Sequence, residues 1–233
     1  MEKLKEKRLA VITQAVTRGL NPAAPLRDSG IPWLGPVPAH WEAKRLKFCF
    51  DSLNHRRVPL SSEERTGMPR DYPYYGASGV IDYVEDFLFE EPLILIGEDG
   101  ANLLSRSTPL AFEARGKYWV NNHAHILKPV SGPFAYWSNL LCIVQYAPWI
   151  TGAAQPKLTK DNLGTILLPC PPVIEQEAIT EFITKASRKI DTLVVAIDEA
   201  IDRLTEYRTA LITAATTGKI DVRGVNIPQP AQP

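Results

Sequence analysis

The sequence contains little cysteine, no long apolar run and no excess of charge of either sign. Its three cysteines, Cys49, Cys142 and Cys170, lack the CxxC spacing of zinc or redox sites, so we expect three buried thiols. No stretch approaches the roughly 20 apolar residues that a membrane span needs, and no signal-peptide core is present, so we expect a cytoplasmic protein without membrane contact. The 26 basic and 26 acidic residues cancel. This balance argues against a polycationic nucleic-acid coat but permits a DNA contact confined to one face.

Motifs for nucleotide binding and hydrolysis are also missing. There is no Walker pattern, no GxGxxG and no specific Ser-His-Asp arrangement. The acid pair Glu98 and Asp99 leaves open a magnesium-dependent nuclease, but no Glu-x-Lys partner follows at short range, so we expect a turn there. His123 and His125 alternate as on one face of a strand, yet a metal needs a further ligand that is not evident. We therefore expect no metal site in this chain.

Glycine and proline are absent from residues 173–217, where apolar residues instead follow a heptad pattern. Such a helix would be roughly 65 Å long, too long to be covered by a domain of about 130 residues. We expect its partner to be a helix of a second chain, although a self-contained helical hairpin or an unspecific dimerisation helix is the plainer alternative. The residues that we expect to face the partner helix are Ile183, Ile190, Leu193, Ile197, Leu204, Tyr207 and Leu211.

The end of this helix is repeated at the start of the chain. Residues 4–17 (LKEKRLAVITQAVT) and 204–217 (LTEYRTALITAATT) are identical at eight of fourteen positions, and a glycine follows each copy, at Gly19 and Gly218. Both copies are typical of a helix that ends at a glycine. The first copy contains only the end of such a helix, so the repeat predicts one half of a circular arrangement that a second chain would close.

Between the two copies, the sequence predicts a proline-rich arm and a mixed α/β domain. Five prolines between residues 22 and 38 exclude a helix there, and Ile31, Trp33, Leu34 and Trp41 should hold the arm against a domain surface. Short strand-like runs separated by glycine, asparagine and aspartate follow. The boundaries that we predict are a short helix at 1–20, a linker at 21–40, a globular domain at 41–172, a long coiled-coil helix at 173–218 and a C-terminal tail at 219–233.

Six short stretches in combination resemble one protein family. They are residues 29–46 (SGIPWLGPVPAHWEAKRL), 74–83 (YYGASGVIDY), 97–102 (GEDGAN), 119–125 (WVNNHAH), 150–158 (ITGAAQPKL) and 168–176 (LPCPPVIEQ). Together with the long helix and its repeated end, they resemble the specificity (S) subunit of type I restriction–modification systems over about residues 3–224. Full S subunits have two target-recognition domains and two long helices, whereas this chain resembles one half of that pattern.

The resemblance implies an α+β fold in which one mixed α/β target-recognition domain is followed by the long coiled-coil helix and preceded by the short helix. It implies a non-catalytic subunit that reads one half-site of double-stranded DNA, and a homodimer that completes a split target. The implied partners are methyltransferase (M) subunits, which use S-adenosylmethionine, and a restriction (R) subunit, which uses ATP and magnesium. The alternatives are the stand-alone nuclease and a coiled-coil adaptor that does not bind DNA.

Residues for DNA recognition are expected in the loops of the domain. Arginine and lysine suit guanine, asparagine and glutamine suit adenine, and small polar loops can contact phosphates. The residues that we nominate are Arg56, Arg57, Arg70, Ser78, Asn102, Arg106, Arg115, Asn121, Asn122, His123, Gln155 and Lys157. Each is also a common kind of solvated loop residue, and recognition residues vary with the target, so the resemblance does not transfer their roles.

Overall fold

The computed structural model describes residues 2–221, 223 and 224. These residues form two compact units. The larger unit is Leu9–Thr184, and the smaller one combines the described residues up to Arg8 with those from Lys185 onward. Residues 225–233 of the predicted C-terminal tail lie outside the described residues.

Two helices occupy the ends of the chain. Helix α1 spans Glu2–Arg18, and helix α6 spans Val173–Thr216 without interruption over 44 residues. Helix α6 begins directly after Pro171 and Pro172, and it contains neither glycine nor proline, the residues that break helices. The predicted short N-terminal helix and long C-terminal helix are confirmed.

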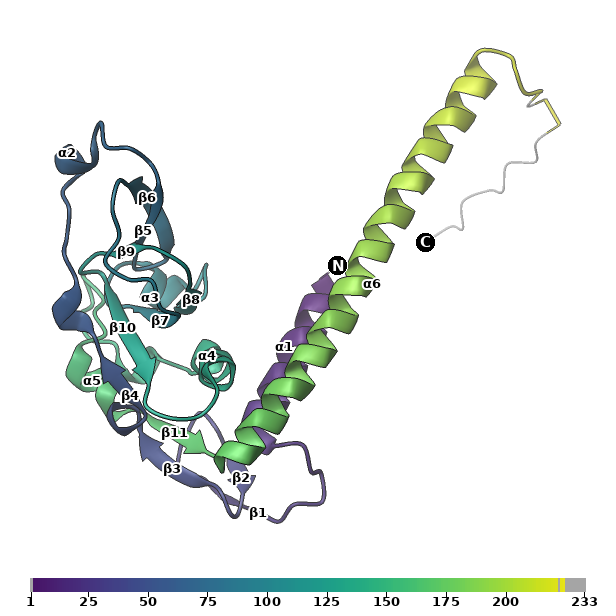
Figure 1. The fold of residues 1–233 in the computed structure, drawn as a ribbon. Helices are drawn as coiled ribbons and strands as arrows, with labels where there is room; N and C mark the ends of the chain where they lie inside the picture. The colour runs from purple at the N-terminus through teal and green to yellow at the C-terminus, as the bar shows by residue number, and fades with distance from the viewer. Residues whose placement is uncertain (1, 222, 225–233) are drawn as a thin grey trace. The chain divides into compact units, whose positions relative to one another are not determined.

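The larger unit is built around a four-stranded antiparallel sheet in the order β4-β10-β7-β8 (Figure 1). The strands are β4 (Phe50–Ser52), β10 (Ala124–Pro129), β7 (Leu93–Gly97) and β8 (Ala111–Ala114). Strand β7 is buried throughout: Ile94 and Ile96 belong to one apolar core, and Leu93 and Leu95 to the other. The unbroken apolar run of β7 therefore results from burial of both faces of the sheet.

A second sheet has the order β6-β5-β9. Strands β5 (Tyr72–Gly76) and β6 (Gly79–Val84) form an antiparallel hairpin, and β9 (Trp119–Val120) pairs parallel to β5. Two short ribbons complete the strands. The first pairs β1 (Leu26–Asp28) with β2 (Pro36–Pro38), and the second pairs β3 (Glu42–Arg45) with β11 (Leu167–Cys170).

Short helices connect and cover these sheets. The α-helices are α2 (Ser62–Arg65), α3 (Asn102–Ser105), α4 (Phe134–Ile143) and α5 (Lys160–Thr165), and the 3-10 helices are η1 (Leu46–Phe48), η2 (Asn54–Arg56) and η3 (Ala147–Trp149). Helix α4 is apolar, mostly buried and packed against β8. The predicted α+β fold, a mixed α/β domain followed by a long helix, is confirmed. No described helix is both long and apolar enough to cross a membrane.

The proline-rich arm is held by its apolar residues, as predicted. Ile31, Leu34 and Trp41 are buried, and Trp33 packs against the same core. The indole Nε1 of Trp41 donates a hydrogen bond of 3.0 Å to Glu175 in the first turn of α6. The arm is thus joined to the point where the long helix begins.

The prediction of three buried thiols is wrong for one cysteine. Cys49 and Cys170 are buried, and their sulfur atoms lie 3.6 Å apart. Cys142 is exposed, and its thiol donates to the carbonyl oxygen of Ala111. Its neighbours Leu141 and Ile143 are the buried residues in this turn of α4, which leaves Cys142 on the outer side.

Candidate nucleic-acid interface

Four loops meet at one edge of the sheets, where β5 and β7 end and β10 begins. The peptide N–H of Glu98 donates to His123, that of Leu158 donates to Glu98, and that of Asn121 donates to Tyr75, all at 2.8 to 3.0 Å. The turn after β5 lies against the end of β7: a Cβ atom added to Gly97 would sit 2.6 Å from the carbonyl oxygen of Ala77. Stretches that are up to 80 residues apart in sequence, about residues 76–79, 97–100, 121–125 and 151–158, therefore form one surface.

Arg57 and Glu98 form the frame of this surface. The guanidinium Nη1 of Arg57 lies 2.5 Å from Glu98 Oε2 and also donates to the carbonyl oxygens of Asn122 and Ala124. Its Nε donates to the carbonyl oxygen of Asn54. The Arg57 and Glu98 side chains are only 17% and 13% exposed. A largely buried arginine with these four acceptors fixes the loops rather than presenting its charge to solvent.

The same frame sets the charge states of Glu98 and His125. Burial alone would raise the pKa of Glu98, but hydrogen bonds from Arg57 and Lys157 and the charge of Arg57 lower it below its ordinary value. Burial lowers the pKa of His125, so this imidazole is neutral at neutral pH. Its Nε2 donates to the carbonyl oxygen of Leu158 at 2.7 Å, and its Nδ1 accepts from the Asn54 side chain at 2.9 Å. His125 therefore contributes hydrogen bonds, not charge.

A groove of about 710 Å³ runs between the loop after β7 and the 151–157 loop. Polar side chains on its walls include Asp99, His123, Gln155 and Lys157. His123 Nδ1 lies 2.9 Å from Asp99, and Lys157 Nζ lies 3.3 Å from Glu98 while its side chain remains half exposed. The carboxylates at this surface thus face cations and an imidazole. Among the described residues, no group of three or more His, Cys, Asp and Glu side chains could hold a metal ion.

Three nominated residues at this surface have polar side chains that the protein itself does not use. The side chains of Ser78, Asn122 and Gln155 are exposed and make no hydrogen bond to another described residue. With His123 and Lys157 they offer hydroxyl, amide, imidazole and ammonium groups on the loops that meet here. This variety of donors and acceptors is what reading base edges and phosphates requires.

The other nominated residues have structural partners. Asn121 is buried and accepts from the backbone N–H of His123, and the Asn102 side chain bonds within the turn that ends at Thr108. The partners of the remaining arginines are the Leu88 carbonyl for Arg56, Asp82 for Arg70, Gln145 and the Val144 carbonyl for Arg106, and Glu113 for Arg115. Each of these four arginines therefore has a partner within the chain, and Arg106 directly follows Leu104 and Ser105 of the groove.

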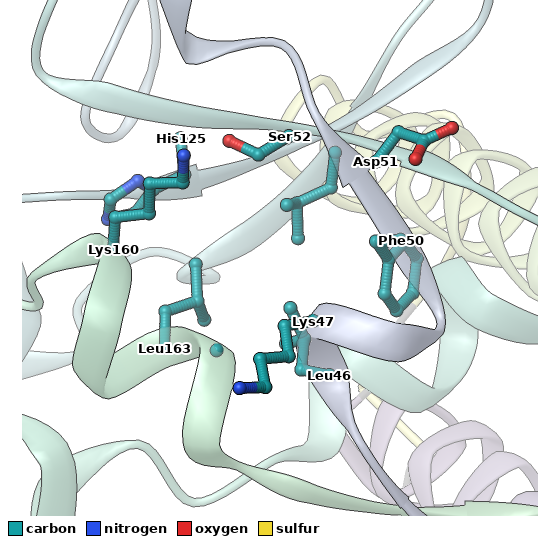
Figure 2. Close-up of a pocket in the computed structure, with 10 residues that line it drawn as sticks. Leu46, Lys47, Phe50, Asp51, Ser52, His125, Lys160 and Leu163 are labelled. Carbon is teal, nitrogen blue, oxygen red and sulfur yellow. The ribbon is translucent and has the colours of Figure 1, made fainter.

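Two further lysines, which we did not nominate from the sequence, lie near this surface. A pocket of about 310 Å³ is lined by His125 and Ser52, by Lys47 from η1 and by Lys160 at the start of α5. Figure 2 shows Lys160 beside the His125 ring and Lys47 on a different wall. Lys160 makes no ion pair with a described residue. The sequence feature that pointed to Lys160 is its position three residues after Lys157, a lysine that we did nominate.

The residues predicted to face a partner helix fall into two groups. Ile183 and Ile190 are buried within the chain. In the larger unit, Ile183 shares a core with Ala15 and Val16 of α1, and in the smaller unit Arg8 of α1 pairs with Asp191. In contrast, Leu193, Leu204, Tyr207 and Leu211 are exposed, and Ile197 is half-buried. Helix α1 thus covers the first part of the heptad face, which we had expected a second chain to cover.

Comparison with known proteins decides the family. The family model of the type I restriction modification DNA specificity domain matches residues 38–203. The chain belongs to this family. A Haemophilus influenzae protein named as type I restriction enzyme specificity subunit S.HindORF215P is 34% identical over 146 residues, which cover 61% of this chain and 36% of that protein.

Solved structures of the family share the fold. The S subunit from M. genitalium matches with a TM-score of 0.56 at 17% identity, and the HsdS subunit from Thermoanaerobacter tengcongensis with 0.51 at 16%. These matches cover 90% and 94% of this chain but 52% of each of the other chains. The chain therefore spans about half the length of the solved S subunits that it matches.

Proposed function

We propose that this chain is the DNA-recognition subunit of a type I restriction–modification complex and that its loop surface reads one half-site of the target. The observation that carries the proposal is the groove lined by His123, Gln155 and Lys157, with the exposed Ser78 and Asn122 on the loops that adjoin it. Family membership and the shared fold of S subunits support it. Because the chain spans half of those subunits, it supplies one recognition domain.

In this proposal, base reading and phosphate binding use different side chains of the surface. Asn122 and Gln155 carry amides that can pair with adenine in the major groove, and His123 and Ser78 donate or accept beside them. Lys157 and Lys160 supply charge for phosphates, which position the duplex without reading its sequence. Arg57 and Glu98 hold these loops in place and do not touch DNA.

The remaining part of the proposal concerns assembly. The exposed apolar side chains of α6, among them Leu193, Leu204 and Tyr207, are proposed to pair with the same helix of a second copy and to dock M subunits. Two identical recognition domains would then read a palindromic target in two parts. This chain is proposed to have no catalytic activity: methylation with S-adenosylmethionine belongs to the M subunits, and ATP- and magnesium-dependent cleavage to the R subunit.

A DNA-binding assay with Gln155→Ala tests the reading surface. The complex of this chain with its M subunit should retard a duplex that carries the target, and Gln155→Ala should weaken that binding by about 1–3 kcal/mol if the amide makes a bidentate base contact. Arg70→Ala is the matched control, because Arg70 pairs with Asp82 away from this surface. Equal losses for both variants, or none for Gln155→Ala, would remove Gln155 from base reading.

The same assay separates the alternatives. Cleavage of DNA by the pure chain with magnesium would favour the nuclease, in which Glu98 and Asp99 would bind the metal. Complex formation with the M subunit but no sequence-selective retardation at any salt concentration would favour an adaptor. The pairing of Glu98 with Arg57 and Lys157 supports neither alternative, because both cations already neutralise the carboxylate that a metal would need.

A further inference from the structure

The repeated helix end has a structural counterpart in the way α1 lies on α6. In the larger unit, Gly19, just after α1, lies against Glu175 in the first turn of α6. In the smaller unit, Arg8 pairs with Asp191, further along α6. Each unit therefore has its own contact between the two helices, near Glu175 in the larger unit and at Asp191 in the smaller one.

Five of the buried or partly buried residues of α1 form one stripe: Leu4, Arg8, Val11, Ile12 and Ala15. Thr13, Val16, Thr17 and Arg18 are covered as well, so the end of α1 is enclosed on more than this side. The spacing of three and four residues is that of a single helix face. Leu9, outside the stripe, is exposed. Up to Ile12, α1 is therefore covered along this stripe alone.

The repeat preserves this stripe almost completely. Its counterparts 200 residues later are Leu204, Arg208, Leu211, Ile212 and Ala215. Four of these five residues are identical to those in α1, and the fifth exchanges valine for leucine. In the described part of the chain the large apolar counterparts are exposed: Leu204 is 66%, Leu211 42% and Ile212 51% exposed. The end of α6 thus carries the same stripe as α1 on a surface that the described residues leave exposed.

From these observations we propose that α1 and the end of α6 from a second copy are alternative occupants of the same stretch of α6. In the dimer, residues 204–217 of the partner displace α1, and Arg208 takes the place of Arg8 beside Asp191. This inference rests on the proposed pairing of two α6 helices and specifies its register. Residues 4–17 therefore act as an internal blocker that competes with dimerisation.

The heptad pattern agrees with this register. Leu204 and Leu211 of the heptad face take the places of Leu4 and Val11 when residues 204–217 replace 4–17. The other heptad residues of this stretch, Tyr207 and Ala214, correspond to the exposed Lys7 and Gln14, so one of the two heptad positions lies in the exchanged contact. If α1 stayed in place, only the heptads of α6 that lie beyond its contact with α1 could pair with a second copy.

The two occupants differ at one informative position. Val16 is fully buried in the core of the larger unit, and its counterpart is Thr216. Thr216 donates its hydroxyl to the Ile212 carbonyl, which limits the cost of burying it. Valine is still the more apolar side chain for this core, so exchange has a small cost that the longer α6 pair has to offset.

Locking α1 to α6 tests the exchange in the full chain. Arg8→Cys and Asp191→Cys are introduced together with Cys142→Ser, because Cys142 is the exposed native thiol. A bismaleimide about as long as an arginine side chain then joins the two new thiols within one chain. The matched control is the same protein capped with N-ethylmaleimide. Both substituted side chains are partly exposed, at 37% and 60%, so the fold should tolerate the changes.

The exchange predicts that the cross-linked chain dimerises at least about tenfold more weakly than the capped control, as measured by sedimentation, because the lock removes the binding-competent state. Equal dimerisation of both proteins would overturn the exchange and leave α6 pairing by its free end. A capped control that stays monomeric at every concentration would overturn the homodimer of the proposed function and the exchange with it.

A second pair of variants tests the blocker without cross-linking. Leu4→Asp weakens only the internal occupant, so it should make the dimer several-fold tighter, whereas Leu9→Asp on the exposed side of α1 should leave dimerisation unchanged. A dimer that is unaffected or weakened by Leu4→Asp would contradict the competition.

Discussion

At the scale of single residues, Arg57 decides whether the loop surface keeps its shape. Its guanidinium serves Glu98 and the carbonyl oxygens of Asn54, Asn122 and Ala124 at once. A lysine has the same charge but no planar fork, so it cannot serve these acceptors together. The Arg57 position therefore requires arginine for geometry as well as for charge.

Arg57→Lys should lower the free energy of unfolding by about 1–3 kcal/mol, because at least one buried acceptor loses its donor. Chemical denaturation measures the loss. Arg70→Lys is the control: its side chain is 68% exposed, so the change should stay within about 0.5 kcal/mol. If both variants were equally stable, Arg57 would not be the frame of this surface.

Glu98 should make stability depend on pH in the acid range. Burial opposes its ionisation, but Arg57 and its neighbours lower its pKa below the value of 4.5 that it has when unperturbed. The folded state thus binds a proton less readily than the unfolded state. The resulting stabilisation is present above about pH 4.5 and is lost as the pH falls through the lowered pKa of the folded state.

Glu98→Gln removes this titration. The difference in unfolding free energy between the wild type and Glu98→Gln should therefore shrink between about pH 6 and pH 3. Denaturation curves at a series of pH values measure it. A difference that stays constant across this range would mean that the pKa of Glu98 is the same in the folded and unfolded chains.

The loops that carry the candidate site could be nominated from sequence, but the roles of their residues could not. Small polar loops indicated Ser78, Gln155 and Lys157, all of which are exposed. Arg57 looks identical to a solvated loop arginine in sequence, because its partner Glu98 is 41 residues away. Burial and pairing between distant segments depend on the folded sheet, which local patterns do not specify.

At the scale of elements, the sequence predicted the long helix but not which segment of the chain packs against it. Residues 173–217 contain no helix breaker and follow heptads, and α6 spans Val173–Thr216. The heptad pattern does not tell which helix covers which turn, so the burial of Ile183 and Ile190 within the chain was missed. Strand β8 likewise depends on the folded sheet, because its four residues, AFEA, carry little strand signal.

Leu204→Asp should abolish or strongly weaken dimerisation, because it places a charge in the proposed seam between two α6 helices. Thr209→Asp is the matched control on the same stretch of helix but outside the heptad face. Light scattering at micromolar concentration measures the mass of each variant. If Thr209→Asp disrupted the dimer as much as Leu204→Asp did, the contact between the two α6 helices would not lie along the heptad face.

At the scale of the whole molecule, the account assigns one recognition domain and one long helix to each chain. Zero net charge is compatible with DNA binding because a few cations, such as Lys157 and Lys160, lie near one face while the acids of that face are paired. Specific binding of this kind depends on salt through a small number of phosphate contacts. Two chains related by a twofold axis would double the number of phosphate contacts and the number of bases that are read.

Selection of DNA targets by the complex of this chain with its M subunit tests the central claim most directly. A random duplex library would be enriched for bound molecules and sequenced. The account predicts a palindromic target in two parts with an unread spacer, because two copies of one domain read the two halves. Enrichment of no sequence, or of an asymmetric two-part target with this chain as the only specificity subunit, would contradict it.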